Sequence, residues 1–121
     1  MELKILVCDD SSMARKMLIK ALPESWGGHI QQAGNGVEAL AQCRENKPDV
    51  VFLDLTMPEM DGFQVLETLK DEGIAPAIFV VSADIQPIAQ ERVLSLGAKA
   101  FVRKPVKSDE LQAALKAQGL L

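Results

Sequence analysis

Short apolar runs alternate along the chain with longer segments that carry apolar residues at every third or fourth position. The short runs predict β-strands, and the longer periodic segments predict amphipathic helices. Most of the strand-like runs are apolar throughout, whereas one of them, HIQQA, is polar and is typical of a strand at a sheet edge. The predicted strands are Leu3–Cys8, His29–Ala33, Val50–Leu53, Ala77–Val81 and Ala98–Val102.

Five helical segments separate or follow these strands. They cover Met13–Leu22, Val37–Glu45, Phe63–Lys70, Ile85–Leu96 and the region of Leu111–Leu115 after Ser108. Ser12 is the expected N-cap of the first helix, and Pro87 is tolerated in the first turn of the fourth. Pro23–Gly28 is predicted to be a loop in which Trp26 covers an edge of the core, and His29 is expected at the surface.

Strands that are apolar on both faces and alternate with helices predict a parallel sheet covered on both sides. The fold class is therefore α/β, a doubly wound three-layer sandwich. Five strands fit the flavodoxin-like order 2-1-3-4-5, whose crevice opens at the carboxyl ends of strands one and three. We expect residues 1–121 to form one domain, because this length is normal for a single buried core.

Composition narrows the class of protein. With 48% hydrophobic and 25% charged residues, the chain is typical of a soluble globular domain. The net charge of −4 and the absence of a basic run argue against direct nucleic-acid binding. No apolar run approaches the ~20 residues of a membrane helix, and no signal peptide is apparent, so we expect a cytoplasmic protein without membrane insertion. Cys8 and Cys43 are expected to be buried, reduced thiols.

Polar residues with chemical potential stand where the central strands end. Asp9 and Asp10 follow the first strand, and Asp54 follows the third. Ser82 follows the fourth strand, and Lys104 comes just after the fifth. Because parallel strands end at the same edge of a sheet, these five side chains are expected to converge. Any one of them alone is more simply a turn former or a surface residue, so the prediction depends on their joint occurrence.

Three carboxylates in one pocket repel each other unless a cation joins them. Mg²⁺ suits the expected set, because it prefers oxygen ligands and keeps waters and a phosphate group. A lysine and a hydroxyl beside the metal are suited to phosphoryl oxygens. Asp54 ends a central strand and faces both the acidic pair and Lys104, so it is the candidate nucleophile, which would form an acyl phosphate.

The same residues, in this order and spacing, resemble the receiver domains of two-component response regulators, the CheY-like family. The motifs are Asp9-Asp10, DLTMPEMDG from Asp54 to Gly62, Ser82-Ala83, Gly97-Ala98 and Lys104-Pro105. The resemblance covers essentially the whole chain and is nearest to free-standing chemotaxis regulators. It implies a domain that carries a phosphoryl group on itself and is not a turnover enzyme.

The resemblance also implies roles for individual residues. Asp54 would accept phosphate from a phosphohistidine, while Asp10, Asp54 and the backbone carbonyl of Thr56 would hold Mg²⁺, with Asp9 acting partly through water. The Lys104-Pro105 bond would be cis. Ser82 and Phe101 match the family's switch pair, although the commoner residues there are Thr and Tyr. Thr56 and Asp84 occupy positions that tune dephosphorylation.

The implied partners are a sensor histidine kinase or phosphotransfer protein, a downstream protein target and a phosphatase. The target would bind the surface of the fourth helix, fifth strand and fifth helix, near Ile88, Phe101, Arg103 and Lys107. Only six residues follow Leu115, so we expect no output domain. A receiver that serves as a relay or scaffold without its own output is the main alternative.

Two enzyme classes share part of the pattern. Gly34–Ala39 (GNGVEA) fits a dinucleotide-binding fingerprint, but it follows the polar strand predicted at the edge, and no substrate domain is expected. Aspartyl-phosphate hydrolases of the haloacid dehalogenase type carry an acid two residues after the nucleophile. Thr56 stands there in this chain, which disfavours that class.

Overall fold

Five parallel strands form a single sheet in the computed structural model, which describes residues 3–26, 29–83 and 86–121. The strand order is β2-β1-β3-β4-β5, as the sequence predicted. The strands are β1 (Ile5–Cys8), β2 (Ile30–Ala33), β3 (Val50–Leu53), β4 (Ala77–Ser82) and β5 (Ala100–Arg103). The polar strand β2 lies at one edge of the sheet, where it pairs with β1.

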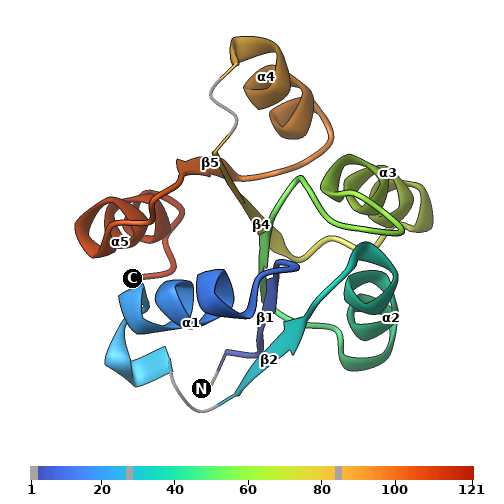
Figure 1. Ribbon diagram of the computed structural model, residues 1–121. Coiled ribbons are helices and arrows are strands. Elements are labelled where there is room, and N and C mark those ends of the chain that lie inside the picture. The colour runs from blue at the N-terminus through green and yellow to red at the C-terminus, as the bar shows by residue number, and fades with distance from the viewer. Residues whose placement is uncertain (1–2, 27–28, 84–85) are drawn as a thin grey trace.

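Helices cover both faces of this sheet. They are α1 (Ser12–Ala21), α2 (Gly36–Asn46), α3 (Gly62–Glu72), α4 (Pro87–Ser95) and α5 (Ser108–Ala117). Figure 1 shows α1 and α5 on one side of the sheet and α2 and α3 on the other. Within the predicted loop Pro23–Gly28, the described part contains one 3₁₀ turn, η1 (Glu24–Trp26).

Each face of the sheet has its own hydrophobic core. Leu6 and Cys8 of β1 point toward α2, α3 and α4, whereas Ile5 and Val7 point toward α1 and α5. This alternation follows from the two-residue period of a strand. Because β1 and β3 are buried on both faces, their sequences are apolar throughout. Trp26 packs in the core with α1 and α5, in agreement with its predicted covering role.

The start of α1 corrects one expectation. Ser11, not Ser12, is the N-cap, and its side chain accepts a hydrogen bond from the Ala14 backbone N–H at 3.2 Å. Ser11 has extended backbone angles, whereas Ser12 already belongs to the helix. Two adjacent serines are present in the sequence, and the backbone conformation after β1 makes the first of them the residue that precedes the helix.

The fifth strand begins later than predicted. Ala98 was expected to open it, but the Ala98 backbone N–H donates to the Val93 carbonyl at 3.0 Å. Gly97 has a φ of 107° in the left-handed region, which glycine adopts without steric cost. Gly97 and Ala98 therefore form the turn that ends α4, and the strand starts at Ala100.

Cys8 and Cys43 are buried and free, as predicted. Burial raises the pKa of the Cys8 thiol well above its usual value, and the nearby Cys43 and Asp9 add to the shift. Burial also raises the pKa of Cys43 to about 11. Both side chains are therefore protonated at neutral pH and act as small core residues.

Within the described residues, no helix is both long and apolar enough to cross a membrane.

Candidate functional site

The carboxyl ends of β1 and β3 bring three aspartates together. Cys8 and Leu53 are paired in the sheet register, so Asp9 and Asp54 follow at the same level. One carboxylate oxygen from each of Asp9, Asp10 and Asp54 lies within 4.8 Å of the other two. The prediction that Asp9, Asp10 and Asp54 lie close together is therefore confirmed.

Lys104 reaches this cluster from the segment between β5 and α5. Its Nζ lies 2.7 Å from Asp9 Oδ2 and 3.4 Å from Asp54 Oδ1. Its backbone N–H donates to the Ser82 carbonyl at 3.0 Å. The Lys104-Pro105 peptide is cis, as the resemblance implied. Lys104 is thus a counterion to two of the three acids.

Burial shapes the protonation of the site. Asp9 and Asp54 are each 6% exposed, whereas Asp10 is exposed to solvent. Burial, followed by the charge of Asp9, raises the pKa of Asp54, and Lys104 and the Thr56 backbone oppose that shift. Burial acts to lower the pKa of Lys104, but its contacts with Asp9 and Asp54 outweigh this effect, so the net pKa is raised.

The donor set fits a hard divalent cation. Ligands of an octahedral Mg²⁺ site, about 2.1 Å from the ion, lie roughly 3 to 4 Å from each other. A set of carboxylate oxygens within 4.8 Å needs only small side-chain rotations to reach that arrangement. The exposed Asp10 leaves one side of the cluster open to water, which Mg²⁺ retains in most protein sites.

The remaining expected residues surround the cluster. Ser82 is the last residue of β4 and is 2% exposed. Phe101 in β5 is half-buried against the core formed with α2, α3 and α4. Thr56 is exposed in the loop between β3 and α3. Asp84 lies outside the described residues.

Sequence reasoning did not identify two residues that hold Asp9. The Ser11 backbone N–H donates to Asp9 Oδ1 at 3.0 Å, and Arg15 Nη1 donates to the Asp9 backbone carbonyl at 2.5 Å. Arg15 lies in the first turn of α1, the helix that follows the acidic pair. An arginine one turn after the N-cap of the helix that follows a strand-end acid is a signal that could have identified it.

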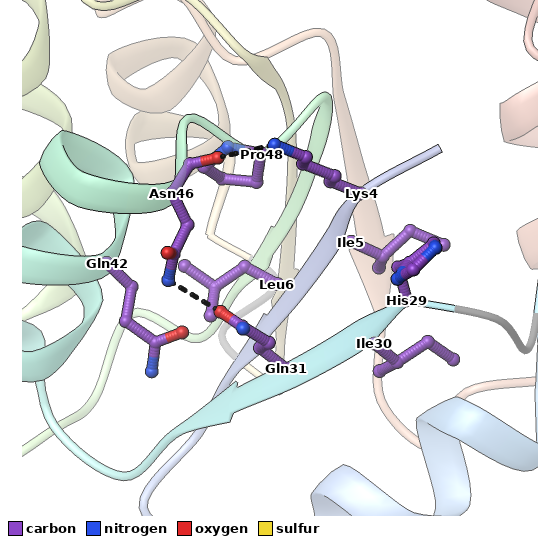
Figure 2. A pocket seen from close by; sticks show the side chains of 9 residues that line it. All are labelled: Lys4, Ile5, Leu6, His29, Ile30, Gln31, Gln42, Asn46 and Pro48. Atoms are coloured by element: carbon purple, nitrogen blue, oxygen red, sulfur yellow. Dashed lines mark hydrogen bonds between the residues drawn. The ribbon is translucent and has the colours of Figure 1, made fainter. Parts of the chain in front are cut away.

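A separate cavity at the other end of the sheet offers different chemistry (Figure 2). It has a volume of about 410 Å³ and lies among the starts of β1 and β2 and the end of α2. Its amides are partly bonded to one another, with Asn46 Nδ2 donating to Gln31 Oε1 at 2.7 Å. None of its lining residues among the described parts of the chain is a carboxylate or hydroxyl, so the acidic cluster remains the candidate reactive site.

Comparison with known proteins agrees with the site. The family model of the response regulator receiver domain matches residues 5–116. The chain belongs to this family. It is 35% identical over 114 residues to the chemotaxis protein CheY of Listeria monocytogenes, covering 94% of this chain and 96% of that protein. It is 33% identical over 112 residues to CheY of Bacillus subtilis, covering 93% of each.

Solved structures show the same fold. The CheX-CheY-BeF₃-Mg²⁺ complex from Borrelia burgdorferi matches with a TM-score of 0.90 at 26% identity, covering 98% of this chain and 90% of that chain. CheY4 of Vibrio cholerae matches with a TM-score of 0.84 at 26% identity over the full length of both chains. The dinucleotide-binding reading of Gly34–Ala39 gains no support, because β2 lies at the sheet edge and not at the crevice.

Proposed function

We propose that this chain is a response regulator whose Asp54 accepts a phosphoryl group from the phosphohistidine of a sensor kinase or phosphotransfer protein. One observation carries the proposal: Asp54 lies at a strand end beside two other acids, with its Oδ1 3.4 Å from the ammonium group of Lys104. In the transfer, an Asp54 carboxylate oxygen forms a bond to phosphorus. The phosphorus–nitrogen bond of the donor breaks, and the imidazole leaves.

The residues of the chain have separate tasks in this transfer. Asp10, Asp54 and the Thr56 carbonyl are the proposed Mg²⁺ ligands, with Asp9 acting partly through water. The ion would neutralise charge on the phosphoryl oxygens. Lys104, which is already 3.4 Å from Asp54 Oδ1, would pair with one phosphoryl oxygen, and the Ser82 hydroxyl would donate to another.

Phosphorylation is proposed to switch a protein-binding surface near Ile88, Phe101, Arg103 and Lys107. Movement of Ser82 toward the phosphate would leave space for the half-buried Phe101 ring. Because the ring is already half-buried, burying the rest of it supplies roughly 1 kcal/mol, which corresponds to about a fivefold population shift. Thr56 and Asp84 are proposed to tune the lifetime of the phosphate.

The relatives support a chemotaxis pathway, since those of Listeria and Bacillus are named chemotaxis proteins. The complex of CheX with CheY supports CheX as the kind of partner to test, and a phosphatase remains among the proposed partners. The proposed output is a contact with a downstream protein. The alternative is a relay or scaffold role without such an output. The beryllofluoride experiment on the switch distinguishes the two roles.

The proposed metal site predicts the behaviour of Asp10→Asn. Loss of one of the three carboxylates is expected to weaken Mg²⁺ binding at least several-fold, because Mg²⁺ relies on few protein ligands. The measurement is a Mg²⁺ titration followed by amide chemical shifts. Asp71→Asn makes the same charge change at an exposed position in α3 and should leave the affinity unchanged. Equal affinity in the wild type and Asp10→Asn would remove Asp10 from the ligand set.

The proposed switch predicts that beryllofluoride with Mg²⁺ changes amide shifts both at Asp54 and around Phe101, Ile88 and Lys107. Ser82→Ala should still take up phosphate on Asp54 but show much smaller changes on the Phe101 face. Ser95→Ala, at the far end of α4, is the matched control. Wild-type changes confined to the Asp54 pocket would contradict the switch and favour the relay or scaffold role.

A further inference from the structure

Arg15 connects three separate parts of the chain next to the acidic cluster. Its Nη1 donates to the Asp9 backbone carbonyl at 2.5 Å, and its Nε donates to Gln32 Oε1 at 2.8 Å. Arg15 belongs to α1, Asp9 follows β1, and Gln32 lies in the edge strand β2. The guanidinium therefore has two partners: its bond to Gln32 lies within the ordinary hydrogen-bond range, and its bond to the Asp9 carbonyl is shorter.

The hydrogen bond from Arg15 to the Asp9 carbonyl also holds the peptide group that leads into Asp10. That carbonyl lies in the same rigid peptide plane as the N–Cα bond of Asp10. Holding the carbonyl therefore fixes the N–Cα axis of Asp10, and the Asp10 carboxylate can then move only by rotation about that bond and within its own side chain. Asp9 itself has further support, since its carboxylate accepts from Ser11 and Lys104.

Asp10 has no such side-chain support. Its carboxylate is exposed, and within residues 3–26, 29–83 and 86–121 no hydrogen bond or ion pair to it is found. The placement of this carboxylate thus depends on the backbone that carries it. Arg15 is the side chain that holds the peptide leading into Asp10.

The second anchor of Arg15 is itself held in place. Gln42 Nε2 of α2 donates to the Gln32 backbone carbonyl at 2.9 Å. The chain of contacts therefore runs from α2 through β2 and Arg15 to the Asp9–Asp10 peptide. A planar guanidinium can serve both partners at once, whereas the ammonium group of a lysine lacks the fixed fork.

We propose that Arg15 is a positioning residue for the metal site, which presets the Asp10 carboxylate by holding the Asp9–Asp10 peptide. The inference rests on the proposed function, in which Asp10 is a Mg²⁺ ligand. The direction of the change in Mg²⁺ affinity when Arg15 is removed distinguishes positioning from a simple charge effect. A positive charge beside the cluster opposes a cation, so removal of the charge alone would strengthen Mg²⁺ binding, whereas loss of positioning weakens it.

The test is a Mg²⁺ titration of the full chain, followed by amide chemical shifts in the wild type and in Arg15→Met. We expect about tenfold weaker binding in Arg15→Met, the size of effect typical when a residue supporting a metal ligand is removed. Lys16→Met removes the same charge from an exposed neighbour in α1 and should bind equally or slightly more tightly. Arg15→Lys keeps the charge and should bind with intermediate affinity.

Two further readouts exclude general damage to the fold. At saturating Mg²⁺ the rate of phosphorylation of Arg15→Met by a small phosphodonor should return to within about twofold of the wild type. Gln32→Ala should weaken Mg²⁺ binding less than Arg15→Met, and the double variant should be no weaker than Arg15→Met alone, because both act through one contact chain. Thermal unfolding verifies folding, and Arg15→Lys carries the test if Arg15→Met does not fold.

Suppose that the wild type binds Mg²⁺ at the acidic cluster and that Arg15→Met and Arg15→Lys bind it equally or more tightly than the wild type. This result would overturn the inference and leave the proposed function intact. A failure to regain phosphorylation at saturating Mg²⁺ would also overturn it, since positioning of the ion would then not be the defect. If the wild type binds no Mg²⁺ at the acidic cluster, both the inference and the proposed function fail.

Discussion

Asp54→Asn is expected to take up no phosphoryl group from a small phosphodonor in the presence of Mg²⁺, whereas the wild type takes up one. The amide of Asn is a poor nucleophile and cannot form the acyl phosphate. The measurement is intact mass after incubation with the donor. Asp61→Asn is the matched control, because Asp61 caps α3 and asparagine caps helices equally well. Phosphate remaining on Asp54→Asn, for instance on Ser82, would contradict the assignment.

Unfolding of the variant does not explain such a loss, because Asp54→Asn should be the more stable protein without metal. Burial raises the pKa of folded Asp54, so ionisation opposes folding once the pH exceeds about 4, the unfolded value. Asparagine lacks this penalty. The melting temperature of Asp54→Asn in EDTA should exceed that of the wild type at neutral pH, and the gap should close as the pH falls below 4.

Gly62→Ala is expected to lower stability sharply and to slow phosphorylation. A Cβ at Gly62 would lie 2.5 Å from the Asp54 carbonyl oxygen and 2.8 Å from Leu55 Cα. Both contacts are with backbone atoms, which cannot rotate away as a side chain can. The strand end that carries the proposed nucleophile or the start of α3 must therefore move. Such overpacking costs about 2 kcal/mol, which lowers the melting temperature by roughly 8 °C for a chain of this length.

Gly34→Ala is the matched control for this prediction. A Cβ there would meet only the ends of two flexible side chains, at 3.4 Å from Glu38 Oε2 and 3.7 Å from Arg15 Nη1. Its melting temperature should stay close to that of the wild type. Thermal unfolding and the initial rate of phosphoryl uptake are compared for both variants. A melting temperature of Gly62→Ala equal to that of the wild type would contradict the prediction, because it would show that the backbone beside Asp54 can move without loss of stability.

The fold was predictable because the strands buried on both faces left an unambiguous pattern. The apolar runs at β1 and β3 indicated a parallel sheet covered on both faces, the polar run at β2 indicated its edge, and the number of strands selected the order among the known doubly wound folds. The ends of the elements were less predictable. Ser11 and Ser12 are equally good caps in sequence. Gly97 does signal the end of α4, but the bond from the Ala98 N–H to the Val93 carbonyl, which delays the start of β5, is not visible in the apolar pattern.

The acidic cluster was predictable for a related reason. Once the strands are parallel, the residues that follow them must meet at one edge, and the contacts of Lys104 with Asp9 and Asp54 followed the same logic. The contacts of Arg15 could not be predicted in this way. They join a helix to an edge strand and to a backbone carbonyl, and their partners are set by packing and not by strand ends.

The role of Asp54 is tested directly by locating the phosphoryl group on the wild-type chain. The protein is phosphorylated with a small donor and Mg²⁺, reduced with borohydride to convert an acyl phosphate to homoserine, and sequenced by mass spectrometry. One modification is expected, at Asp54, formed in the presence of Mg²⁺ and absent when the metal is chelated. A modification at Asp9, Asp10 or Ser82, or equal uptake without Mg²⁺, would contradict it.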